Sequence, residues 1–275
     1  GLDVALRTLE GKRDLVLVEG LLDVVAFQAQ GVPNVAGLGG AGDLLTKNRW
    51  EALADLGVHQ VTLAMDNDAA GRGGLVKAVD NLRNVPDGPV VYVVDPSDLG
   101  EHKDPDELVR AEGLDAWRAI LAKRQPGAVW RGQVFLEGIT PASSDQERRA
   151  AVEAILEYDA DLRGPRVALD REDLLERTAE ATGYSYEALA DLADDHARRR
   201  REIEAEQNAQ RLLDQAQRDA DAAGPVEAVE RLREGLASVA AAAEDPPLVF
   251  SVDRLDEETK AVPEGRPTGW AVLDA

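Results

Sequence analysis

The sequence contains no cysteine, and its apolar stretches are short. Without cysteine, the 275-residue chain has no disulfide, no thiolate zinc site and no cysteine nucleophile. Charged residues interrupt the longest apolar runs, so we expect no membrane span, and no signal peptide is recognisable. The expected protein is therefore soluble and cytoplasmic. Its 44% of hydrophobic residues suffice for at least one core, in one large domain or two smaller ones.

Positive charge is also scarce. The chain has 31 lysines and arginines against 53 aspartates and glutamates, which gives a formal net charge of −22. This balance argues against a surface that coats nucleic acid, because such a surface needs Lys and Arg to neutralise phosphates. It does not exclude nucleic-acid chemistry at a metal site, because bound Mg²⁺ neutralises clustered acids.

Residues 1–124 alternate between short β-branched runs and helical patterns. Gly31 is placed to end the first helix, and Thr46 is placed to cap the second. Strands that alternate with helices of about ten residues indicate right-handed βαβ units and a parallel sheet covered on both faces. The predicted strands are residues 14–18, 34–38, 58–65 and 89–94, and the predicted helices are 21–30, 46–56, 73–82 and two short ones that end near residue 123.

After residue 125 the strand signals fade, and three helices are predicted over residues 145–158, 170–182 and 186–195. Residues 196–243 are rich in Ala, Glu, Gln and Arg, which predicts a long helix or helical hairpin, broken at Gly224-Pro225. An extended tail follows. We therefore expect an α/β domain in residues 1–125, a helical subdomain in 126–195, a helical linker in 196–245 and an extended segment in 246–275.

Acidic residues follow three of the predicted strands. The sequences VEGLLD and MDNDAAGR stand at the ends of the first and third strands, and KDPDE follows the fourth strand at the same edge. Because the carboxyl ends of parallel strands share one edge of a sheet, these acids can converge. Hard oxygen ligands without a nearby His or Cys select Mg²⁺ or Mn²⁺ over zinc. The predicted metal site consists of Glu19, Asp23, Asp66, Asp68, Asp104 and Asp106.

Each of these motifs alone also has an ordinary structural interpretation. A D-x-D after a strand is usually a turn, and Glu-Gly is as readily a turn and helix start. Asp-Pro-Asp is a common helix N-terminus, where acids favour the helix dipole. Only their joint placement at successive strand ends favours a metal site.

Two further motifs partly match the patterns of known ligand-binding sites. The loop from Asp66 begins like a calcium-binding EF-hand, but Lys77 occupies the position where a bidentate Glu is needed. Gly37-x-Gly39-x-x-Gly42 matches a dinucleotide fingerprint, but that interpretation leaves the acids after the first and fourth strands without a role. The alternative is a glycine-rich turn whose N–H groups lie near the crevice, which would suit a phosphate.

Three motifs occur together over residues 12–124, namely E-G-x-x-D, D-x-D-x-A-G-R and K-D-P-D-E. In this order and spacing the chain resembles the TOPRIM core of bacterial DNA primases and phage-like primase–helicases. More weakly, ASSDQERRAAVEAIL and DREDLLERTAEATGYSYEALADL resemble the helical subdomain that follows TOPRIM in primases. GRPTGWAVLDA resembles the segment before the phosphate loop of hexameric replicative helicases. The resemblance implies a Rossmann-like TOPRIM sheet flanked by helices, followed by an all-helical subdomain and a helical connector.

The resemblance also implies a function, which is template-directed synthesis of RNA primers in DNA replication with Mg²⁺ or Mn²⁺ as cofactor. The implied substrates are NTPs and a single-stranded DNA template, and the implied partner is a replicative helicase domain. The implied catalytic residues are Glu19, Asp66 and Asp68, with Glu19 either a metal ligand or a general base. Arg72, Lys77 and Lys103 are candidates for phosphate or nucleic-acid contact, although a solvated helix face explains them equally well.

Primases of this type also carry a zinc-binding module and a basic subdomain, which have no counterpart in these 275 residues. We therefore expect the chain to be part of a larger primase–helicase-like protein. Two other functions stay open. One is a TOPRIM-type, metal-dependent nuclease that uses the same acids to activate water. The other is a non-catalytic connector between primase and helicase.

Overall fold

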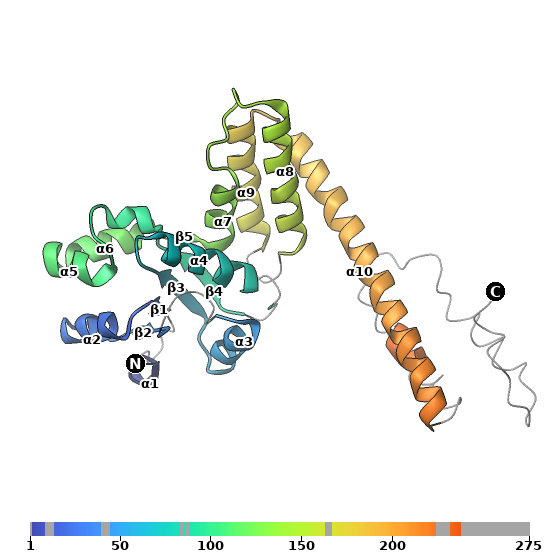
Figure 1. The fold of residues 1–275 in the computed structure, drawn as a ribbon, viewed down its shortest axis with the longest axis horizontal. Helices are drawn as coiled ribbons and strands as arrows, with labels where there is room; N and C mark the ends of the chain where they lie inside the picture. Colours follow the sequence, from blue (N-terminus) through green and yellow to red (C-terminus); the bar gives the residue numbers. More distant parts are fainter. Residues whose placement is uncertain are drawn as a thin grey trace, which may run out of the picture. The chain divides into compact units, whose positions relative to one another are not determined.

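A five-stranded sheet with the strand order β2-β1-β3-β4-β5 organises the first half of the chain (Figure 1). The structure, a computed structural model, describes residues 2–8, 14–39, 45–82, 85, 88–162, 167–223 and 232–237. Four strands are parallel and lie where the sequence predicts them, because each is a short buried run rich in β-branched residues. They are β1 (Asp14–Val18), β2 (Val35–Gly37), β3 (Gln60–Ala64) and β4 (Val90–Val93).

The fifth strand departs from the predicted parallel sheet. β5 (Gln125–Pro126) has only two residues and runs antiparallel to β4, with Gln125 opposite Val93. Because Pro126 has no N–H to donate, it suits an edge position. β5 leads into α7 (Gly127–Phe135), a helix that the sequence analysis did not predict. A two-residue strand is too short for any periodic signal in the sequence.

Side chains alternate along the strands, so each face of the sheet has its own core. Along β1, Leu15 and Leu17 belong to one core, and Val16 and Val18 belong to the other. The sheet is therefore covered on both faces, as the sequence predicts. On the Val16 side lie α2 (Leu21–Ala29), α5 (Pro105–Glu112) and α6 (Leu114–Lys123); on the Leu15 side lie α1 (Leu2–Thr8), α3 (Lys47–Asp55), α4 (Ala69–Leu82) and α7.

Helix α4 begins four residues earlier than predicted, at Ala69 instead of Gly73. Its first turn is stabilised because Asp68 Oδ1 accepts a hydrogen bond from the Gly71 N–H at 2.8 Å. Glycine is required at position 71, since a Cβ atom there would collide with the carbonyl oxygen of Asp66. Thr46 is the N-cap residue of α3 as predicted, but its side chain makes no capping hydrogen bond.

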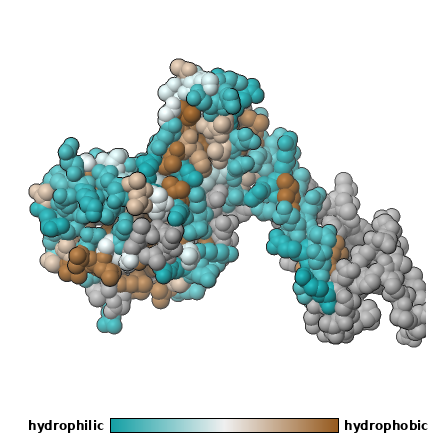
Figure 2. Space-filling view, viewed as in Figure 1, coloured by the Kyte–Doolittle hydropathy of each residue, from teal (hydrophilic) through white to brown (hydrophobic). Residues whose placement is uncertain are grey.

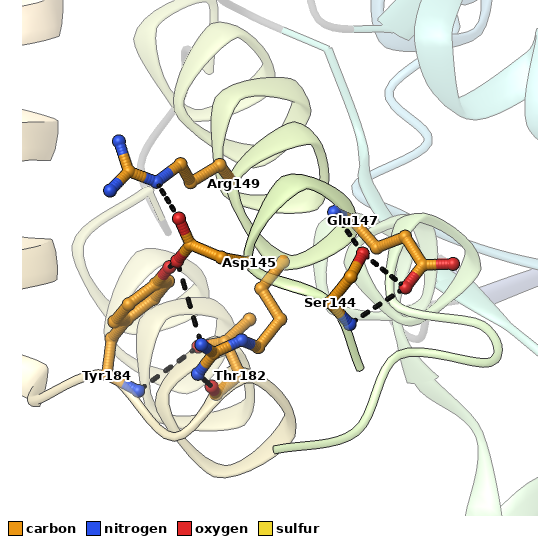
Figure 3. A network of polar contacts seen from close by, with 7 residues as sticks. Ser144, Asp145, Glu147, Arg149, Thr182 and Tyr184 are labelled. Carbon is orange, nitrogen blue, oxygen red and sulfur yellow. Dashed lines mark hydrogen bonds and ion pairs between the residues drawn. The ribbon is translucent and has the colours of Figure 1, made fainter. Parts of the chain in front are cut away.

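The predicted helices of the second half are confirmed as α8 (Asp145–Ala160), α9 (Val167–Thr182) and the start of α10 (Tyr186–Ala223). A capping box begins α8, in which the Ser144 hydroxyl accepts from the Glu147 N–H and the Glu147 carboxylate accepts from the Ser144 N–H (Figure 3). The core on the Leu15 side of the sheet continues into these helices through Trp130, Ile155 and Leu174.

Helix α10 is continuous, whereas the sequence analysis placed one helix over residues 186–195 and another from 196. No Gly or Pro occurs within α10, so nothing in the local sequence interrupts it. The chain divides by contacts into two compact units, Gly1–Asp194 and Asp195–Ala275. The predicted break at Gly224-Pro225 and the predicted segment from residue 246 lie outside the described residues, and the predicted domain boundaries stay predictions.

The surface carries mostly hydrophilic side chains, in keeping with the charge of the chain (Figure 2). An exception lies on α2, where Leu21, Leu22 and Val25 are all exposed. Figure 2 shows apolar atoms along the lower edge of the sheet region, near the place where Figure 1 draws this helix. Among the described helices, none combines the length and the apolar content that crossing a membrane requires.

Candidate metal centre at the carboxyl edge of the sheet

Three of the predicted ligands form a compact group of carboxylates. Asp23 lies in the first turn of α2, Asp104 is the N-cap residue of α5, and Asp106 lies in the first turn of α5. One carboxylate oxygen of each lies within 4.8 Å of the other two. Asp23 and Asp106 are buried, with exposed fractions of 9% and 7%. Converging carboxylate oxygens of this kind are suited to a hard divalent cation.

The local backbone fixes these carboxylates. The Gly20 N–H donates to Asp23 Oδ2 at 3.0 Å, and a Cβ atom on Gly20 would lie only 2.7 Å from that oxygen. Asp104 Oδ1 accepts from the Glu107 N–H at 2.7 Å. Pro105 is the first helical residue, where a missing N–H loses no helical hydrogen bond. The ordinary interpretation of Asp-Pro-Asp as a helix start is thus confirmed, and that helix start brings its acids to Asp23.

Glu19, Asp66 and Asp68 provide the other acids. Glu19 directly follows β1, and Asp66 and Asp68 follow the neighbouring strand β3. Burial raises the pKa of Glu19, and the charges of Asp66 and Asp68 raise it further. Burial also raises the pKa of Asp66, against the opposing effect of Lys103. We call the following six residues the acidic cluster: Glu19, Asp23, Asp66, Asp68, Asp104 and Asp106.

Within the acidic cluster, Asp23, Asp104 and Asp106 on one side and Glu19, Asp66 and Asp68 on the other repel one another. Burial raises the pKa of Asp23, and the charges of Asp104 and Asp106 add to this effect. The charges of Asp23 and Asp104 likewise raise the pKa of Asp66 across the edge of the sheet. The carboxylates therefore repel one another without a bound cation, and a divalent cation would relieve that repulsion.

Two buried carboxylate oxygens of the acidic cluster have no hydrogen-bond partner among the described residues. They are Glu19 Oε2 and Asp106 Oδ1, although the other oxygen of Asp106 pairs with Arg110. A buried charged oxygen without a partner costs free energy unless a donor or a cation compensates for it. These oxygens and the all-oxygen donor set fit Mg²⁺ or Mn²⁺.

The three predicted phosphate-binding residues lie in different surroundings. Lys103 belongs to the site, because its Nζ lies 3.6 Å from Asp66 Oδ2 and 67% of its side chain is exposed. The guanidinium of Arg72 pairs with Glu137 and lies over the ring of Trp130, so this side chain is directed toward α7 and the turn after it. Lys77 is exposed on α4. The structure therefore places the ammonium group of Lys103 beside a carboxylate of the acidic cluster, and directs the guanidinium of Arg72 to Glu137.

The glycine-rich turn after β2 uses its first N–H groups within the sheet. The Leu38 N–H donates to the Val18 carbonyl at 2.9 Å, and the Gly39 N–H donates to the Glu19 carbonyl at 3.1 Å. These two groups are not free for a phosphate. They instead fix the backbone of Glu19 beside β2. Residues 40–44 of this turn lie outside the described residues.

Comparison with known proteins agrees with this geometry. Residues 16–109, which include the whole acidic cluster, match the protein family described as Toprim-like. A DNA primase of Pseudomonas aeruginosa is 35% identical over 185 residues, which are 66% of this chain and 26% of that protein. This chain carries a TOPRIM domain of the bacterial DNA primase type. It spans about a quarter of the length of that primase.

Solved structures support the assignment of the TOPRIM domain. A DNA primase domain from Pseudomonas aeruginosa has a TM-score of 0.56 and 28% identity, over 70% of this chain and 58% of that one. The Escherichia coli primase catalytic core has a TM-score of 0.53 at 23% identity, over 65% of this chain and 54% of that one, and shows the same fold. A DNA primase of Deinococcus radiodurans is 28% identical over 207 residues, which are 73% of this chain and 33% of that protein.

Two residues that support the acids of the TOPRIM domain were missed in the sequence analysis. Glu107 Oε2 accepts from the Lys103 N–H at 2.7 Å, and the Glu107 N–H donates to Asp104, so Glu107 holds the residue before the N-cap against the first turn of α5. The spacing Asp-x-x-Glu at a helix start is a recognisable signal for a related arrangement, the capping box, in which the Glu accepts from the N–H of the N-cap residue instead. Asn67, between the two acids of the D-x-D, donates from its side chain to the loop before α5. Its partners could not be found from the sequence, because they lie more than thirty residues away.

Proposed function

We propose that the acidic cluster holds Mg²⁺ or Mn²⁺, and that the protein containing this chain synthesises RNA primers on single-stranded DNA. The observation that carries this proposal is the convergence of Asp23, Asp104 and Asp106, with buried carboxylate oxygens that have no described partner. Asp66 lies close enough that the charges of Asp23 and Asp104 add to the effect of burial and raise its pKa. The relatives of the chain are DNA primases, which gives the proposed metal centre its reaction class.

In the proposed reaction the 3′-hydroxyl of the primer attacks the α-phosphate of an NTP, and pyrophosphate leaves. Bound divalent cations would supply orientation of the triphosphate and neutralisation of developing charge. Asp66, Asp68, Asp104 and Asp106 would hold these ions, with Asp23 beside them. Glu19 would either bind metal or take the proton of the attacking hydroxyl, and its raised pKa makes it a stronger base than an ordinary glutamate.

Among the basic candidates, Lys103 is best placed to contact a phosphate, because its side chain is exposed beside Asp66. Arg72 must first leave Glu137, and Lys77 requires a substrate that reaches along α4. A negatively charged chain needs a basic partner to bind the template. We propose that other parts of the full-length protein grip the DNA and that a replicative helicase domain acts with it. A primase catalytic domain of the same fold has been solved bound to single-stranded DNA.

Calorimetric titration of this chain with Mn²⁺ tests the metal centre. The double variant Asp66→Asn with Asp68→Asn should weaken binding at least about tenfold, because it removes two charged ligands. The matched control is Asp55→Asn with Asp115→Asn, which removes two exposed charges elsewhere and should bind like the wild type. Absence of binding by the wild type, or equal loss in both variants, would contradict the proposal.

The reaction itself is tested with the full-length protein, NTPs and a single-stranded DNA template. NTP-dependent product that disappears in the Asp66→Asn with Asp68→Asn variant supports primer synthesis. Degradation of the template without NTPs would identify a nuclease instead. A protein that binds Mn²⁺ but shows neither activity would be a connector.

A further inference from the structure

Asn67 links two loops of the metal centre. Its side-chain Nδ2 donates to the carbonyl oxygens of Gly100 at 3.0 Å and His102 at 3.3 Å. Its backbone N–H donates to the carbonyl oxygen of Lys103 at 2.7 Å. Three hydrogen bonds therefore run from the middle residue of the D-x-D to the segment directly before Asp104.

The segment reached by Asn67 is also anchored on its other side. The Lys103 N–H donates to Glu107 on α5, and the ring of His102 lies 2.7 Å from Glu112 at the end of the same helix. Loop and helix are thus held together by contacts of their own. Among the described hydrogen bonds, those of Asn67 are the ones that join this segment to the loop after β3.

Repulsion within the acidic cluster acts against this link. Asp66 and Asp68 flank Asn67, and Asp104 follows the segment that Asn67 holds, so loss of the link would let like charges separate. Mg²⁺ and Mn²⁺ sites tolerate little variation in ligand distance, because coordination is close to octahedral with short bonds. A cation shared by the two loops needs them at a fixed spacing before it binds.

We propose that Asn67 is a positioning residue, which holds the Asp104 and Asp106 side of the acidic cluster in register with the Asp66 and Asp68 side. The inference rests on the proposed metal centre and adds a residue that touches no metal itself. Removal of its amide should leave every ligand present but weaken cation binding, because the two sides would have to be brought together during binding.

The chain offers a matched control in Asn34, which lies before β2. Its Nδ2 donates to the carbonyl oxygen of Asp14 at 3.0 Å, at the amino end of β1. Asn34 and Asn67 are both half-buried, and both donate from a side-chain amide to backbone carbonyls of the same domain. They differ in the end of the sheet that they link, so the pair separates metal positioning from general stabilisation.

The test compares Mn²⁺ affinity by calorimetry for the wild type, Asn67→Ala, Asn67→Leu and Asn34→Ala. Leu is close to Asn in size but cannot donate a hydrogen bond. A loss of affinity that Asn67→Leu shares with Asn67→Ala is therefore not caused by the smaller size of Ala. We expect both Asn67 variants to bind Mn²⁺ about tenfold more weakly, as outer-shell substitutions do, while Asn34→Ala keeps the wild-type affinity. Equal affinity of wild type and both Asn67 variants, or equal loss in Asn34→Ala, would overturn the proposal.

Hydrogen exchange of the metal-free proteins provides a second measurement. Peptides that cover residues 99–104 should exchange faster in the Asn67 variants than in Asn34→Ala, because the link that protects them is lost. An unchanged exchange rate of residues 99–104 in the Asn67 variants would show that Asn67 does not hold this segment in place. A wild-type chain that fails to bind Mn²⁺ would remove the proposed metal centre and this inference together. A binding wild type with unaffected Asn67 variants would remove this inference alone.

Discussion

Helices α5 and α8 both begin with acidic residues, but the groups around these acids have charges of opposite sign. At α5, Asp104 and Asp106 face Asp23, and one oxygen of Asp106 is buried without a partner among the described residues. At α8, Asp145 accepts from the Tyr184 hydroxyl at 2.9 Å and from Arg149 at 2.7 Å (Figure 3). The pKa of Asp23 is raised by burial and by like charges, whereas hydrogen bonds from Tyr184 and Arg149 lower the pKa of Asp145.

The difference shows what separates a capping acid from a candidate ligand. Both helices begin with a capping residue, an acid in the first turn and a Glu at the third position. At α8 Asp145 meets Arg149 of the same helix and Tyr184 of the segment after α9, so its charge is satisfied locally. At α5 the acids lie close to another acid, Asp23 of α2. Asp106 Oδ2 pairs with Arg110, but Asp106 Oδ1 has no partner among the described residues. The motif is the same, and the neighbours decide its role.

The largest expected effect is on catalysis by the full-length protein. Glu19→Gln should reduce NTP incorporation about a hundredfold, because Gln keeps the size of Glu but loses the charge needed for a base or ligand. Glu147→Gln at the start of α8 is the matched control and should leave incorporation unchanged. Near-normal incorporation by Glu19→Gln, with circular dichroism like that of the wild type, would remove Glu19 from the mechanism.

A smaller effect concerns the stability of the metal-free chain. Asp23→Asn should raise the melting temperature at pH 7 by about 2 °C, because it removes a buried charge among like charges. Asp145→Asn should lower it, because Tyr184 and Arg149 lose a charged acceptor. Thermal melting with and without Mn²⁺ measures both, and Mn²⁺ should stabilise Asp145→Asn as it does the wild type. A fall in melting temperature for Asp23→Asn would contradict the assigned repulsion.

The changes in stability that Asp23→Asn and Asp145→Asn cause depend on pH in a definite direction. The raised pKa of Asp23 means that the folded state binds its proton more tightly than the unfolded state. The advantage of Asp23→Asn is therefore greatest at neutral pH and vanishes as the pH falls to about 4. The lowered pKa of Asp145 gives stability that is complete above about pH 4 and is lost only below it.

The smallest expected effect concerns the cap of α8. Ser144→Ala should reduce the free energy of unfolding by about 1 kcal/mol, because the Glu147 N–H loses its capping acceptor. Urea denaturation measures this change, and calorimetry should show unaltered Mn²⁺ binding. A loss of Mn²⁺ affinity in Ser144→Ala would show that the start of α8 affects the acids at α5. It would contradict the view that the two helix starts act independently.

The sequence by itself determined the parallel strands, most helices and the positions of the acids along the chain. Buried β-branched runs such as Asp14–Val18 have a signal that lies within five residues, and Gly31 ends α2 at a positive φ that favours glycine. The motifs around Glu19 and Asp66 also lie at strand ends, and the motif around Asp104 follows β4 at the start of α5, so parallel topology brings them to one edge. The roles of these acids stay predictions.

Only the tertiary structure decided which polar groups meet. β5 and α7 depend on contacts with β4 and α9, so a local pattern does not reveal them. Arg72 is directed to Glu137, and Asn67 to the carbonyls of Gly100 and His102, across tens of residues. At α8 the acid Asp145 meets donors, whereas at α5 one oxygen of Asp106 is buried without a partner among the described residues. Charge interactions depend on distance in space, and a sequence pattern fixes that distance only within one turn or one strand.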